Sequence, residues 1–127
     1  MTRRIRLSLL LFFSVAAILL TTLPGTTRLI HGLAELWGYS ESTAAALHYG
    51  LFALLTLVWF RLAILWMPRA RAILVAAGVA LVVGTTTETL QLFIPGRGAT
   101  LLDLGANWLG ILTVAAWLFL RQPSRQS

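Results

Sequence analysis

Six polar side chains lie within long apolar runs or close to their ends. They are His48, Glu88, Gln91, Arg97, Asp103 and Asn107. A carboxylate inside hydrocarbon must pair, take up a proton or line a wet cavity, so Glu88 is the leading candidate for a functional residue. Gln91 follows Glu88 by three residues and Asn107 follows Asp103 by four, so the members of each pair share one helical face.

These residue types suit two kinds of chemistry. Arg97 with the two amides would hold an anionic or sugar-bearing lipid headgroup, while Glu88 accepts hydrogen bonds from hydroxyl groups. Alternatively, Glu88 would be a general base with His48 or Asp103 as its partner, and Arg97 would stabilise an anion. No Ser or Cys nucleophile accompanies the histidine in the motif, which weighs against an enzyme. Asp103 also follows Thr100 by three residues, the spacing of a helix-capping box.

The composition indicates an integral membrane protein with one domain, residues 1–127. Hydrophobic residues make up 58% of the chain and charged residues only 11%, against about 25% charged in soluble domains. The absence of cysteine excludes disulfides, thiolate metal sites and cysteine catalysis, and the remaining ligand types are too few for a metal site, so no metal or other cofactor is expected. The net charge of +6 comes from arginines at the ends of apolar runs, not from a basic stripe interleaved with aromatics, so no nucleic-acid partner is expected.

Four apolar runs predict a four-helix transmembrane bundle. They cover residues 7–23, 44–60 with an extension to 67 left open, 72–94 and 101–120. A signal peptide is the rival interpretation of 7–23, but the run is long for one and no typical cleavage site follows it, so we expect a retained span. Eight of the ten arginines fall before the first run, between the middle two or after the last, which places both termini in the cytoplasm. An amphipathic segment at about 27–37 is expected on the outer surface.

This topology gathers the six polar residues into one layer at the outer-leaflet side. The third run carries a small residue every fourth position ahead of the glutamate, at Ala76, Ala80 and Gly84. In the fourth run, Asp103, Asn107 and Gly110 form a second stripe. Because small residues let membrane helices approach closely, we expect these two stripes to dock against each other.

The motif resembles that of VanZ-like membrane proteins. It consists of Glu88-x-x-Gln91-x-Phe93-x-Pro95-x-Arg97, then Asp103-x-x-x-Asn107-x-x-Gly110, with His48-Tyr49 in the second span. Ala44 and Ala45 stand where that family often has an Asp-Lys pair, and Val114 stands where a glycine is common. The resemblance implies a small four-helix protein of the bacterial cytoplasmic (inner) membrane. The family's name-giving member is associated with resistance to the glycopeptide teicoplanin, but the family has no established biochemical activity.

Three functions stay open on this evidence. The first is a cell-envelope protein that binds a membrane lipid or a lipid-linked envelope precursor through the outer polar layer. The second is a structural or assembly subunit of an envelope complex, in which the layer only fixes helix register; its protein partners are open. The third, given less weight, is an intramembrane acid/base enzyme using Glu88 with His48 or Asp103.

Overall fold

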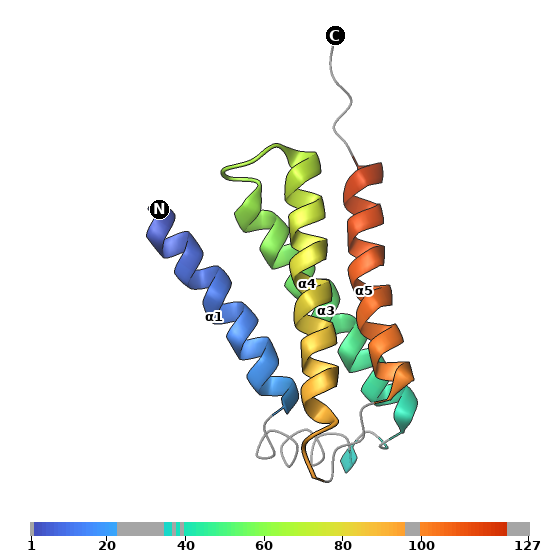
Figure 1. Ribbon diagram of the computed structural model, residues 1–127. Helices are drawn as coiled ribbons and strands as arrows, with labels where there is room; N and C mark the ends of the chain where they lie inside the picture. Colours follow the sequence, from blue (N-terminus) through green and yellow to red (C-terminus); the bar gives the residue numbers. More distant parts are fainter. Residues whose placement is uncertain (1, 23–34, 37, 39, 96–99, 122–127) are drawn as a thin grey trace.

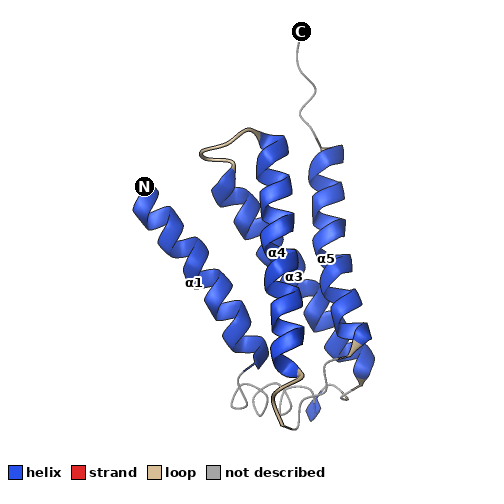
Figure 2. Ribbon diagram, in the orientation of Figure 1, coloured by secondary structure: helices blue, strands red, loops and turns tan. Residues whose placement is uncertain are grey.

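In the part of the chain that the structure describes, four helices form an antiparallel bundle (Figure 1). The computed structural model describes residues 2–22, 35–36, 38, 40–95 and 100–121. The helices are α1 (Arg3–Thr22), α3 (Glu41–Ala63), α4 (Arg69–Gln91) and α5 (Leu101–Leu120). All regular structure in the described ranges is helical (Figure 2), which confirms the predicted all-α class.

The outside of the bundle is apolar, as in a membrane protein. Helices α3, α4 and α5 are each long and apolar enough to cross a membrane. Large aliphatic side chains point outward in the middle of these helices, where Leu54 is 59% exposed and Val82 is 66% exposed. A water-soluble bundle would place polar side chains at such positions.

Helix boundaries follow local capping chemistry. Helix α3 begins at Glu41 because the Ser40 side chain accepts a hydrogen bond from the backbone N–H of Thr43. It ends at Ala63, and turns occupy the stretch up to 67 instead of a helical extension. Helix α4 starts directly after Pro68 and ends at Gln91, while α5 has the bounds 101–120 expected from the sequence. Of the expected amphipathic segment 27–37, the structure describes only residues 35 and 36.

The core of the bundle forms around α3. Phe52 of α3 is fully buried, and a Cβ added at Gly84 of α4 would lie 3.1 Å from its ring. A Cβ added at Gly110 of α5 would overlap the backbone carbonyl oxygen of Tyr49 and lie 3.2 Å from the nitrogen of Ala53, so α3 and α5 touch backbone to backbone. The glycines of both predicted stripes therefore pack against α3. We expected them to pack against each other.

Helix α1 packs less closely than the other three helices (Figure 1). It buries Leu10, Ser14 and Ala17 against the bundle. The indole N–H of Trp59 on α3 donates a hydrogen bond of 2.9 Å to the Ser14 hydroxyl. This bond supplies a specific polar tie between α1 and the rest of the fold.

Charges separate to the two ends of the bundle. The seven arginines in the described ranges lie at the end where α1 begins, α5 ends and α3 is connected to α4 (Figure 1). They are Arg3, Arg4, Arg6, Arg61, Arg69, Arg71 and Arg121. The acids Glu41, Glu88 and Asp103 lie on the halves of their helices nearest the opposite end. The two ends are called below the arginine end and the acidic end.

Candidate functional site

A chain of hydrogen bonds joins three helices near the acidic end. Nδ1 of His48 on α3 lies 3.0 Å from Oδ1 of Asn107 on α5. The Asn107 amide nitrogen donates to Oε1 of Glu88 on α4 at 3.3 Å. His48 Nδ1 is also 3.5 Å from the same glutamate oxygen. We call these three residues the polar triad.

The triad is buried because the helices meet closely where it lies. Asn107 is fully buried and Glu88 is 5% exposed, whereas the His48 side chain keeps 18% of its surface. Gly110 lies one helical turn from Asn107, and Tyr49, whose carbonyl it meets, follows His48 directly. The close approach at Gly110 therefore fixes the distance between α3 and α5. It does so at the level where His48 and Asn107 form their hydrogen bond.

The bonding pattern fixes the roles of the two histidine nitrogens. An amide oxygen can only accept, so His48 Nδ1 must carry the hydrogen that it shares with Asn107 Oδ1. The other ring nitrogen, Nε2, makes no hydrogen bond to a described residue. An imidazole held through Nδ1 with Nε2 open is positioned to accept a hydrogen bond or a proton from a ligand.

Two other predicted site residues, Gln91 and Asp103, are not part of the triad. Gln91 is 3% exposed and lies on α4, one turn beyond Glu88. Asp103 accepts a hydrogen bond of 2.7 Å from the Thr100 hydroxyl, and its backbone N–H donates to the same hydroxyl oxygen. These two bonds form the predicted cap at the start of α5, and in the described ranges no hydrogen bond or ion pair joins Asp103 to the triad. Arg97, the remaining predicted site residue, lies outside the described residues.

Buried threonines do not belong to the site, although they are polar. The hydroxyls of Thr56 and Thr87 donate to the carbonyls of Phe52 and Val83, each one turn earlier in its own helix. Such bonds satisfy a hydroxyl locally and link no helices. The triad, by contrast, links three helices.

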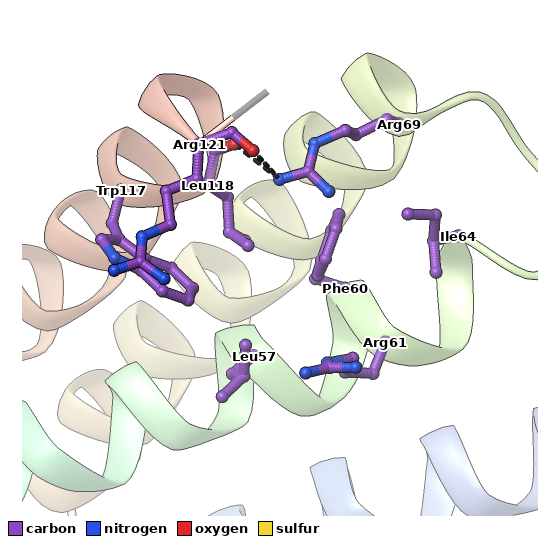
Figure 3. Close-up of a pocket in the computed structure, with 8 residues that line it drawn as sticks. All are labelled: Leu57, Phe60, Arg61, Ile64, Arg69, Trp117, Leu118 and Arg121. Atoms are coloured by element: carbon purple, nitrogen blue, oxygen red, sulfur yellow. Dashed lines mark hydrogen bonds between the residues drawn. The ribbon is translucent and has the colours of Figure 1, made fainter. Parts of the chain in front are cut away.

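A second polar feature lies at the arginine end. Arg61, Arg69 and Arg121 line a cavity of about 270 Å³ together with Trp117 and four apolar residues (Figure 3). The sequence pattern accounts for these arginines by membrane topology alone. In the sequence, the only sign that these arginines share a site is their position at helix ends. They lie in the last turn of α3, at the start of α4 and directly after α5.

Neither feature has the composition of a metal centre. The described residues contain no group of three His, Cys, Asp or Glu side chains that could hold a metal ion. Comparisons with protein-family models, with curated proteins and with solved structures give no match to this chain.

Proposed function

We propose that this chain is a small membrane protein of the bacterial cell envelope whose polar triad binds the headgroup of a lipid or of a lipid-linked envelope precursor. The observation that carries the proposal is the half-open histidine. Asn107 holds the ring through Nδ1, and Nε2 has no bond to a described residue. A histidine that served only to fix helix register would gain nothing from an open nitrogen and a partly exposed ring.

The proposed topology follows from the separation of charges. Arginines accumulate on the cytoplasmic side of membrane proteins, so the arginine end would lie in the cytoplasm together with both termini. Helix α1 would cross the membrane as well as α3, α4 and α5, and the triad would face the outer leaflet. The resemblance of the Glu88–Gly110 motif to VanZ-like proteins supports a bacterial inner membrane as the location.

The ligand chemistry follows from the groups in the layer. A carboxylate and an imidazole nitrogen both accept hydrogen bonds from sugar or glycerol hydroxyls. Arg97, which the motif places in the connection between α4 and α5, would add a fork of donors for a phosphate. A headgroup with hydroxyls and one phosphate would use all of these groups.

A structural role is the second candidate, and one specific observation favours it. Asn107 is fully buried and uses both ends of its amide to connect α3 with α4. Hydrogen bonds between membrane helices contribute about 0.6 kcal/mol each on average, so the triad could act mainly by fixing helix register. The protein would then serve as a subunit of an envelope complex.

A crossed pair of substitutions at His48 separates the two roles. The amide nitrogen of Asn stands as many bonds from Cβ as Nδ1 does, so His48→Asn keeps the donor to Asn107 and removes Nε2. His48→Gln places its amide at the level of Nε2 and removes the Nδ1 donor. Thr89→Val is the matched control, because Thr89 is exposed beside Glu88 and bonds only to the Thr85 carbonyl in the described ranges.

The measurement is native mass spectrometry of the detergent-purified proteins, with thermal unfolding as the stability readout. Under the binding proposal, wild type and Thr89→Val retain a defined lipid, and His48→Asn loses it at unchanged stability. Full lipid retention by His48→Asn would contradict the proposal. No lipid in any variant, with stability lost only in His48→Gln, would favour the structural role instead.

A further inference from the structure

We propose that the cavity at the arginine end is a second binding site, which takes the phosphate of an anionic lipid. Three helices supply its walls, and three guanidinium groups surround it (Figure 3). This site is independent of the polar triad, which lies near the other end of the bundle.

The three arginines bring positive charge without a counter-ion. None of the four acidic residues of the chain lines the cavity. The one ion pair within the described ranges joins His48 to Glu88, near the opposite end. Like charges that converge in a hollow repel one another unless an anion neutralises them, so the cavity favours an anionic ligand.

Two of the arginines are held in place by the protein itself. Nη2 of Arg69 donates to the carbonyl oxygens of Leu118 and Arg121, at 2.8 Å and 3.2 Å, and so satisfies the C-terminal end of α5. The Arg69 guanidinium lies 5.2 Å from the centre of the Phe60 ring, and that of Arg121 lies 4.9 Å from the Trp117 ring. Stacking of this kind orders a guanidinium. It leaves the N–H edge of Arg121 for an anion, whereas Nε of Arg69 is buried in the protein.

The third arginine is available to a ligand. Arg61 is exposed in the last turn of α3 and makes no hydrogen bond to a described residue. Together the three groups present more N–H donors than the protein uses. A phosphate, with several acceptor oxygens, matches this surplus through forked hydrogen bonds.

The lining of the cavity favours a lipid over a free phosphate. Leu57, Ile64 and Leu118 form apolar walls between the arginines. Trp117 is 44% exposed, an arrangement typical of tryptophan at the level of lipid headgroups. A ligand with an anionic head and an apolar body would satisfy both parts of the cavity, whereas a free phosphate would satisfy only the arginines.

The test compares two double variants, each of which removes two positive charges. Arg61→Gln with Arg121→Gln alters the cavity and spares Arg69, which caps α5. Arg4→Gln with Arg71→Gln is the control, because both residues are exposed at the same end and neither lines the cavity. Each protein is titrated in detergent with phosphatidylglycerol and with phosphatidylcholine, and bound lipid is counted by native mass spectrometry.

We expect wild type to prefer phosphatidylglycerol. The double variant at Arg61 and Arg121 should weaken that binding by about tenfold or more, because it loses hydrogen bonds between charged groups. The control variant at Arg4 and Arg71 should change the binding by less than about twofold. Equal weakening by both double variants, or by neither, would overturn the site. Displacement of the lipid by millimolar inorganic phosphate would overturn the lipid assignment, since the cavity would then be selecting a free anion.

Discussion

Gly110 determines how closely α5 approaches α3, and Gly110→Ala tests whether that approach supports the polar triad. The added methyl group would overlap the carbonyl oxygen of Tyr49 and press on the nitrogen of Ala53 at 3.2 Å. Both neighbours are backbone atoms, so no side chain can rotate away and the helices must separate. Overpacking of a close contact costs about 1–3 kcal/mol, and we expect a loss of that size in the free energy of unfolding. Separation of the helices would also stretch the bond of 3.0 Å between His48 and Asn107.

The same helix supplies a matched control. A Cβ added at Gly105 meets no atom within 4 Å, so Gly105→Ala should leave stability unchanged or raise it slightly through better helix propensity. Both variants are measured by reversible unfolding in mixed micelles, with denaturing detergent as the variable. Gly110→Ala as stable as Gly105→Ala would refute the close helix contact.

Four further substitutions test other hydrogen bonds of the fold. Asn107→Ala leaves both of its partners without the amide and should lower the free energy of unfolding by about 1–3 kcal/mol in the same micelle assay; an unchanged value would show that the amide links nothing. Trp59→Phe and Ser14→Ala should each loosen α1 and should not be additive when combined, as measured by the rate at which protease cuts α1; strictly additive effects would rule out their hydrogen bond. Thr100→Val removes the cap of α5 and should cost about 1 kcal/mol, with faster amide exchange in the first turn of that helix at Asp103; unchanged exchange would count against the capping bond.

The four helices could be predicted from the sequence because apolar run length and capping residues act locally. Residues 101–120 are bounded by a Thr-x-x-Asp cap and by Arg121, and both signals are visible in the sequence. The end of α3 was harder to predict, because the apolar run continues through Ile64, Leu65 and Trp66 although the helix ends at Ala63. Hydrophobicity alone does not distinguish a helical residue from an apolar turn.

The candidate site could be predicted in part. Depth along each helix brought His48, Glu88 and Asn107 to one level, and the structure joins them. Depth does not determine which helices are neighbours across the bundle. The partner of Gly110 on α3, and the convergence of three arginines on one cavity, depend on how the helices are rotated about their axes. When apolar residues cover every face of a helix, the spacing of those residues in the sequence does not reveal how the helix is rotated.

We infer that Asn107 holds the His48 ring through Nδ1, which leaves Nε2 open to a ligand. Nitrogen-15 NMR of histidine-labelled protein in lipid nanodiscs tests this directly, and His31→Gln identifies the His48 signals because the chain has only two histidines. We expect the neutral ring to carry its hydrogen on Nδ1, and we expect this form to persist in Thr89→Val and to be lost in Asn107→Ala. A neutral ring with its hydrogen on Nε2, unaffected by Asn107→Ala, would contradict it.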